Sequence, residues 1–84
     1  GADGISLEEG LMATDSDTAL MAELAISRSE QTIVLTDGGK LGKRSFLSYA
    51  PLDKADRIIT GKDADPEFLE MLRQRGIDIC TAGK

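Results

Sequence analysis

Apolar residues recur at helical spacing between Asp15 and Arg28. Three pairs of them lie four positions apart: Leu20 and Leu24, Met21 and Ala25, and Ala22 and Ile26. This spacing places a broad apolar stripe along one side of a helix. Asp15 can supply the oxygen of an N-cap. The pattern therefore predicts an amphipathic helix over residues 15–28.

The segment from Asp65 to Gly76 has the clearest helical pattern in the chain. Asp65 suits the N-cap, and Pro66 suits the first helical position, where its missing N–H costs no hydrogen bond. Gly76 is typical of a helix C-terminus. The predicted buried stripe consists of Phe68, Leu69 and Leu72.

Three short apolar runs predict β-strands. The first, Thr32 to Thr36, lacks polar alternation, so we expect a central strand that is buried on both faces. The sequence DGG at 37–39 ends this strand. The other two runs are RIIT at 57–60 and IDICT at 77–81.

Two further segments have no clear period. Residues 1–15 carry three glycines and several acids, and we expect a loop there. Residues 43–56 are interrupted by Pro51, so they predict at most a short helical turn or a brief strand.

The predicted order of elements is helix, strand, loop, strand, helix, strand. Strands separated by helix-length segments favour a parallel sheet with right-handed crossovers. The expected fold class is therefore α/β, a Rossmann-like piece built on a parallel sheet. Ligands of such sheets bind at the carboxyl ends of the strands, which is where TDGGK (36–40) lies.

Composition excludes several classes of function. The net charge is −5, so no global basic field attracts DNA or an anionic membrane. No apolar stretch approaches the ~20 residues that a membrane-spanning helix needs. Histidine is absent, which removes the commonest general base and metal ligand, and no cysteine–histidine cluster exists for structural zinc. We expect neither a metal nor a cofactor.

The cysteine and the methionines predict no chemistry. Cys80 is the only cysteine, so it cannot form an internal disulfide, which fits a reducing cytoplasm. It falls in a predicted buried strand, and we expect it to be an inert core residue. Met12, Met21 and Met71 are expected to fill the core.

The stretch VLTDGGKLGK, residues 34–43, is the main candidate for chemistry. As a nucleotide-binding P-loop it fails on spacing, because only three residues separate Gly38 from Gly42 and Lys43. It also fails on chemistry, because Arg44 stands where the motif needs Ser or Thr.

As a general anion site the same stretch fits better. Gly38 and Gly39 allow positive φ and close approach, so consecutive N–H groups can converge on phosphate oxygens, and Lys40 adds a positive charge. Asp37 could accept hydrogen bonds from sugar hydroxyls. Turn chemistry alone favours the other interpretation, a tight turn with solvated lysines. Asp3, in the GADG loop, is open to the same two interpretations.

Several motifs together resemble one protein family. They are GADGIS followed by EGL, a helix, IVLTDGGKLGKRSF, APLDKADRIIT and a final strand with GIDI. Their order and spacing resemble the carboxyl-terminal half of the effector-sensing domain of DeoR-type transcriptional regulators. That family's pattern has a Gly-x-Asp-Gly-Ile loop, a helix and a strand ending in Leu-Ala-Asp-Ser-Ser-Lys-Phe-Gly. A Pro-Leu and an Ile-Thr-Asp strand follow.

The resemblance implies a fold similar to ribose-5-phosphate isomerase, glucosamine-6-phosphate deaminase and CoA transferases. It also implies a cytoplasmic repressor whose phosphorylated sugar effector releases an amino-terminal winged helix-turn-helix from its operator. The acid and lysine of the family's Asp-Ser-Ser-Lys motif match Asp37 and Lys40, and its acidic loop residue matches Asp3. The implied ligand-binding residues are Asp3, Gly4, Asp37, Gly38, Gly39 and Lys40.

The chain departs from the family pattern at three places. Gly38 and Gly39 replace two serines, which removes two hydroxyls and leaves a more permissive backbone. Residues 18–22, early in the first helix, lack the family's Glu and Lys. Gly61 stands where the strand typically ends in Asp.

We expect residues 1–84 to be a single fragment of a sensor domain, without the DNA-binding module and the first sensor strands. DNA contact would then occur only through the absent module. The resemblance implies a homo-oligomer, and the thin core of so short a chain is compatible with burial against another chain.

The alternative from another class is a sugar-phosphate isomerase-like enzyme. Asp3 would act as its base, and Lys40 would stabilise the enediolate. The regulator is favoured over the enzyme, because the isomerase's own catalytic run does not follow Asp3.

Overall fold

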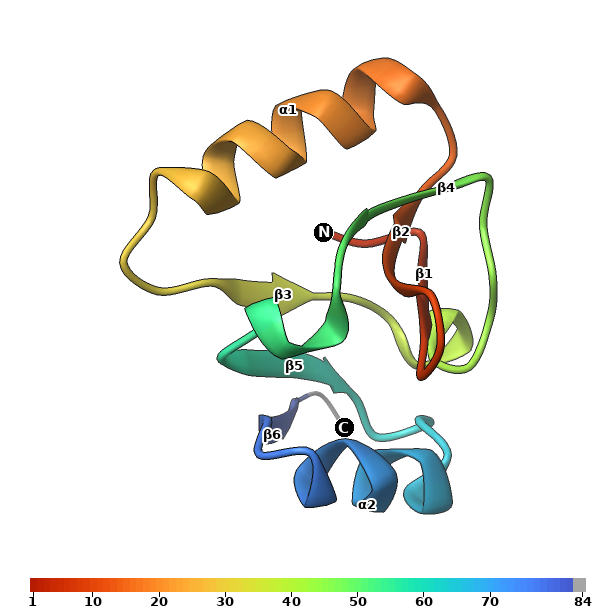
Figure 1. The fold of residues 1–84 in the computed structure, drawn as a ribbon. Coiled ribbons are helices and arrows are strands. Elements are labelled where there is room, and N and C mark those ends of the chain that lie inside the picture. The colour runs from red at the N-terminus through yellow and green to blue at the C-terminus, as the bar shows by residue number, and fades with distance from the viewer. Residues whose placement is uncertain (83–84) are drawn as a thin grey trace.

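The computed structural model describes residues 1–82, and their strands form two three-stranded sheets (Figure 1). The architecture is mixed α/β. No helix within residues 1–82 is long and apolar enough to cross a membrane. The elements in chain order are β1 (Gly4–Ser6), β2 (Gly10–Ala13), α1 (Ser16–Ser27), β3 (Ile33–Leu35), the 3-10 turn η1 (Gly38–Lys40), β4 (Leu47–Ala50), the 3-10 turn η2 (Leu52–Lys54), β5 (Arg57–Gly61), α2 (Pro66–Gln74) and β6 (Asp78–Ala82).

β3, β5 and β6 form a parallel sheet with β5 in the centre. Ile58 of β5 pairs with Val34 on one side and with Ile79 on the other. Because side chains alternate along a strand, these three point to the same face, and Ile58 is fully buried there. The predicted parallel sheet is confirmed for these strands.

β3 lies at the edge of this sheet, so the prediction of a central strand buried on both faces is wrong. Val34 is buried, but Ile33 and Leu35 point to the opposite face and are 47% and 57% exposed. An unbroken apolar run does not distinguish a central strand from an edge strand, and here tertiary pairing made β5 the central one.

β1, β2 and β4 form the second sheet, which is antiparallel. The expectation of a loop over residues 1–15 is therefore wrong. β1 and β2 are too short to establish a period, and β2 is held in place by β4, where Leu11 pairs with Ala50. The uncertain segment 43–56 contains both a brief strand, β4, and a short helical turn, η2.

The N-terminal helix α1 is confirmed, and the Asp15 side chain caps it by accepting a hydrogen bond from Thr18 N at 2.7 Å. The helix packs on β2 and β4 through a narrower stripe than predicted. Ala19 is buried and Ala22 and Ile26 are partly buried. The other apolar residues of the expected stripe are exposed: Leu20, Met21 and Leu24.

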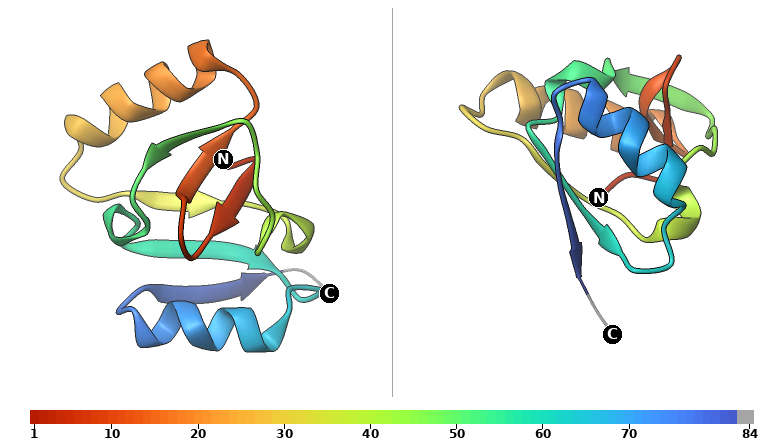
Figure 2. Two further views of the ribbon diagram at one scale, coloured as in Figure 1. Left: turned by 45° about the vertical axis from the view of Figure 1, so that its right-hand side comes forward. Right: turned by 90° about the horizontal axis from the view of Figure 1, so that it is seen from below.

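The second helix, α2, is confirmed together with its cap, since the Asp65 carboxylate accepts a hydrogen bond from Glu67 N at 3.2 Å. Its predicted stripe of Phe68, Leu69 and Leu72 is buried. Both α2 and the antiparallel sheet lie on the same side of the parallel sheet (Figure 2). The opposite face of the parallel sheet carries no layer within the described part of the chain.

Two expectations about core residues are wrong. Cys80 is exposed, because it lies on the uncovered face of the edge strand β6. Met12 is buried as predicted, but Met21 and Met71 are exposed on the outer sides of their helices.

Candidate functional site

The candidate site lies where the carboxyl ends of β3 and β5 meet, which is where a parallel sheet is expected to bind ligands. Residues 36–45 follow β3, and residues 62–64 follow β5. The N-terminal residues 1–5 run beside the first of these segments. Thr36 Oγ1 donates to the Ala2 carbonyl at 3.2 Å, and Gly42 N donates to the Ile5 carbonyl at 2.7 Å.

The turn Asp37 to Lys40 leaves several of its polar groups available. The Asp37 carboxylate does not cap η1. Lys40 N donates to the Asp37 carbonyl at 3.1 Å, but the amides of Gly38 and Gly39 donate no hydrogen bond within residues 1–82. The turn therefore presents two adjacent free N–H groups beside a lysine.

Lys40 and Asp37 form a loose ion pair. The Lys40 Nζ lies 3.7 Å from Asp37 Oδ2, and the two side chains are 41% and 69% exposed. An exposed pair of this kind contributes at most about 1 kcal/mol, so a ligand can displace it at little cost.

Gly38 is required for close packing rather than for its φ angle. Neither Gly38 nor Gly39 has positive φ, so the turn does not use the left-handed conformation that these glycines allow. A Cβ on Gly38 would lie 2.6 Å from Asp63 Oδ1 and 2.7 Å from Ala64 N. The turn after β3 thus rests directly on the loop after β5.

Replacing Gly38 by alanine should lower the free energy of unfolding by about 1–3 kcal/mol, because the Ala64 backbone must move to admit the methyl group. Gly39→Ala is the matched control. Its Cβ would lie 3.3 Å from Asp37 Oδ1, an exposed side chain that can turn away, so we expect a change within about 0.5 kcal/mol. Urea unfolding followed by circular dichroism measures both. Equal losses would contradict the tight packing of the two loops.

Asp3 serves a structural role in this conformation. Its Oδ2 accepts hydrogen bonds from Thr14 N at 3.1 Å and from Thr14 Oγ1 at 3.4 Å, which tie residue 3 to the end of β2. The Tyr49 hydroxyl donates to the Gly1 carbonyl at 3.4 Å. Burial raises the pKa of Tyr49, and the nearby Asp3 carboxylate raises it further.

Gly4 is buried against the segment that follows η1. A Cβ at this position would lie 2.8 Å from the Lys43 carbonyl oxygen. Gly4 therefore lets β1 approach residues 43–45 closely. The Asp3 carboxylate itself lies beside Thr14 and near Tyr49, away from the Lys40–Asp37 ion pair.

Sequence reasoning missed Asp63, which follows β5 and lies against the Asp37–Lys40 turn. Asp63 Oδ1 lies over both Gly38 and Gly61, where Cβ atoms would come within 2.6 and 2.7 Å of it. The predicted strand 57–60 already pointed to this edge, because the ends of neighbouring parallel strands meet there.

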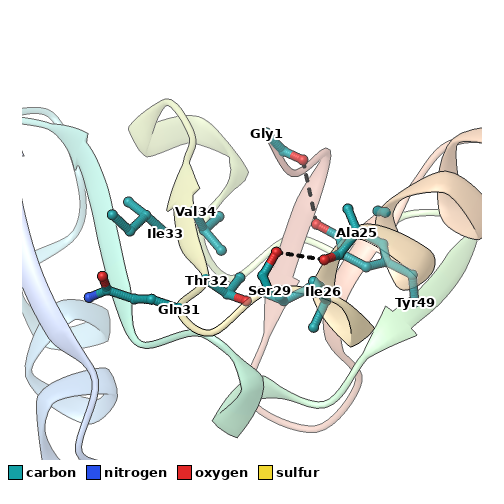
Figure 3. A pocket seen from close by; sticks show the side chains of 11 residues that line it. Gly1, Ala25, Ile26, Ser29, Gln31, Thr32, Ile33, Val34 and Tyr49 are labelled. Atoms are coloured by element: carbon teal, nitrogen blue, oxygen red, sulfur yellow. Dashed lines mark hydrogen bonds between the residues drawn. The ribbon is translucent and has the colours of Figure 1, made fainter.

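Two cavities lie elsewhere in the molecule, beside α1. The first, of about 290 Å³, lies between α1 and β3 and contains no charged side chain (Figure 3). The second, of about 460 Å³, lies between α1 and η2 and is lined by four acids and one lysine: Glu23, Glu30, Asp53, Asp56 and Lys54. Neither lining suits a phosphate dianion, and neither includes the Asp37–Lys40 turn.

Within residues 1–82, no group of three or more Asp, Glu, Cys or His side chains is placed to hold a metal ion. The polar groups at the strand ends are instead lysines, carboxylates and backbone amides. This chemistry can bind a small polyhydroxylated anion through the amides and lysines, with carboxylates accepting from hydroxyls.

Comparison with known proteins identifies the family. Residues 1–62 match the family described as DeoR C terminal sensor domain. The chain is also similar to proteins named HTH-type transcriptional regulator UlaR, from Escherichia coli strain K12 / DH10B and from Shigella boydii serotype 18. It is 38% identical to each over 71 residues, which are 84% of this chain and 28% of each relative.

The chain therefore spans little more than a quarter of the length of these curated relatives. The match confirms the resemblance seen in the sequence motifs. It also favours the regulator over the isomerase-like enzyme, since the relatives are named as transcriptional regulators. The chain belongs to the family of DeoR C-terminal sensor domains.

Proposed function

We propose that this chain is the effector-sensing part of a transcriptional repressor and that its effector is a phosphorylated sugar. The observation that supports this most directly is the turn after β3, where free amides of Gly38 and Gly39 adjoin the Lys40 ammonium. The membership of the chain in a sensor-domain family supports the same conclusion.

The phosphate of the effector is proposed to bind the amides of Gly38 and Gly39 and the ammonium of Lys40. Backbone N–H groups and lysines are the usual partners of phosphate oxygens. Lys43 and Lys62 are exposed on the segments that follow η1 and β5, and the Asp63 carboxylate lies over Gly38. The two cavities beside α1 are apolar or acidic in lining, so they are poorer candidates for the phosphate.

The sugar hydroxyls are proposed to donate to Asp37, with Asp3 and the Gly4 backbone closing the site from the N-terminal side. Asp37 makes no cap hydrogen bond and its ion pair with Lys40 is loose, so its oxygens can accept from a ligand. Asp3 is held near Thr14 by two hydrogen bonds and would contribute a preorganised carboxylate.

Regulation would occur by population shift. The effector must bind the DNA-released state more tightly than the DNA-bound state, and the difference in affinity sets how far the operator complex dissociates. DNA binding is assigned to a helix-turn-helix module outside residues 1–84, as the names of the relatives suggest. We further propose a fold like that of ribose-5-phosphate isomerase and CoA transferases, a homo-oligomer and a cytoplasmic location.

Replacing Lys40 or Asp37 by alanine in the complete regulator should leave operator affinity within about twofold and impair release by the effector. Loss of one hydrogen bond to a charged group should raise the effector concentration for half-release by about 10- to 100-fold. Fluorescence anisotropy of labelled operator DNA, titrated with a panel of sugar phosphates, measures both quantities.

Lys54→Ala is the matched control, because Lys54 is an exposed lysine on η2 and belongs to a different part of the surface. It should respond to the effector like the unchanged protein. If the Lys40 and Asp37 variants also release the operator at the normal effector concentration, the proposed site is wrong. If no sugar phosphate releases the operator from the unchanged protein, the proposed class of effector is wrong.

A further inference from the structure

The loop after β5 places a carboxylate without a partner against the turn after β3. A hydrogen bond from Ala64 N to the Gly61 carbonyl, at 3.2 Å, closes this loop around Asp63. Asp63 is exposed, and within residues 1–82 its carboxylate accepts no hydrogen bond and forms no ion pair. Its oxygens are therefore free to accept hydrogen bonds from a ligand.

Two glycines make room for this carboxylate. A Cβ on Gly38 would lie 2.6 Å from Asp63 Oδ1, and a Cβ on Gly61 would lie 2.7 Å from the same oxygen. Neither glycine has positive φ, so what each contributes here is the missing side chain and not backbone freedom. The carboxylate lies across the ends of β3 and β5, and Figure 2 shows the two loops at the same end of the parallel sheet.

Position 61 is also a place where the chain departs from the family pattern. The pattern ends this strand in Asp, whereas the chain has Gly61. The Asp63 oxygen lies where a side chain of residue 61 would begin, so a later residue brings a carboxylate to the same place. Asp63 itself lies just beyond residues 1–62, the stretch that matches the family.

We infer that Asp63 is an effector-binding residue that accepts a hydrogen bond from a sugar hydroxyl, with the phosphate on the Lys40 side of the turn. The inference rests on the proposed function and extends it. It adds a residue from the loop after β5, and it fixes the direction in which the effector lies.

The charges around the turn determine this direction. Asp63 lies over Gly38, and a carboxylate repels a phosphate dianion at such short range. Lys40 lies at the far end of η1 and attracts the phosphate, and the free amide of Gly39 is next to it. A sugar hydroxyl is uncharged and can donate to a carboxylate. The hydroxyl end of the effector therefore belongs beside Asp63, and the effector spans the ends of two neighbouring strands.

The test titrates the complete regulator, bound to labelled operator DNA, with pentose and hexose monophosphates and follows release by fluorescence anisotropy. Asp63→Ala should raise the sugar phosphate concentration for half-release by about 10-fold or more, because a hydrogen bond to a charged group is lost. Operator affinity should stay within about twofold, which also shows that the variant is folded. Asp53→Ala is the matched control, since Asp53 is an exposed acid on η2, which precedes β5, and it should respond like the unchanged protein.

The double variant Gly61→Asp/Asp63→Ala returns the carboxylate to residue 61. Apart from chain neighbours, the described atoms within 4 Å of a Cβ on Gly61 belong to Asp63, so shortening residue 63 makes room for the new side chain. This variant should recover the half-release concentration of the unchanged protein to within about threefold.

A normal or tighter response of Asp63→Ala, alongside an impaired Lys40→Ala, would overturn the inference and leave the proposed site standing. A tighter response would mean that the phosphate, and not a hydroxyl, lies beside Asp63. Failure of the double variant to recover the response would also overturn the inference, because the loss would then come from the altered loop. If Lys40→Ala responds normally as well, the proposed site is wrong and the inference falls with it.

Discussion

Replacing Ile58 by alanine is expected to lower the free energy of unfolding of the 84-residue chain by about 2–5 kcal/mol. Ile58 lies at the middle of the central strand β5 and has no exposed surface. Its neighbours in register, Val34 and Ile79, belong to the two flanking strands, so the substitution leaves a cavity at the centre of the sheet's inner face. Urea unfolding followed by circular dichroism gives the difference.

Ile59→Ala is the matched control for this prediction. Ile59 is the next residue of the same strand, but its side chain points to the outer face and is only partly buried. The expected loss is under about 1.5 kcal/mol, since less apolar surface is returned to water. If the two variants lost equal stability, the assignment of the inner and outer faces of the sheet would be wrong.

The parts of the fold that the sequence predicted are those determined by local chemistry. An aspartate side chain caps the start of each helix, Asp15 for α1 and Asp65 for α2, and Pro66 follows the cap of α2. A cap, a first-turn proline and a helical stripe act within a few residues of one another, so they can be recognised without tertiary information. The short apolar strands β5 and β6 were also predicted, because β-branched runs flanked by turns are distinctive.

The parts that the sequence did not predict depend on contacts between distant segments. β2 is a strand because Leu11 pairs with Ala50, and nothing near residue 11 indicates that partner. The position of β3 at the sheet edge, and the exposure of Cys80 on β6, depend on strand order. Strand order is a property of the whole chain, and no local pattern specifies it.

Only the local part of the candidate site could be predicted from the sequence. The turn from Asp37 to Lys40 could be recognised because it directly follows an apolar strand. The contribution of Asp63 could not, since its position over Gly38 requires β3 and β5 to be neighbours. A side chain at residue 38 would collide with the loop after β5, so this contact accounts for the glycine at that position.

Replacing Gly10 by alanine should destabilise the antiparallel sheet by about 2–5 kcal/mol, from two separate causes. Gly10 has a φ of +84°, a conformation that costs an L-residue about 1–2 kcal/mol. A Cβ there would also lie only 2.3 Å from the Ala50 carbonyl oxygen, so β2 and β4 would have to separate where they pair.

Gly76→Ala isolates the first of these two causes. Gly76 has nearly the same φ, +87°, but a Cβ there would have no neighbour within 4 Å. Alanine at this position should therefore lower the free energy of unfolding only by the strain of the left-handed backbone conformation, about 1–2 kcal/mol. The difference between the two variants, measured by urea unfolding, is the cost of forcing β2 away from Ala50. If Gly10→Ala were no worse than Gly76→Ala, β2 and β4 would not be packed as closely as the structure has them, and the antiparallel sheet would tolerate a wider separation.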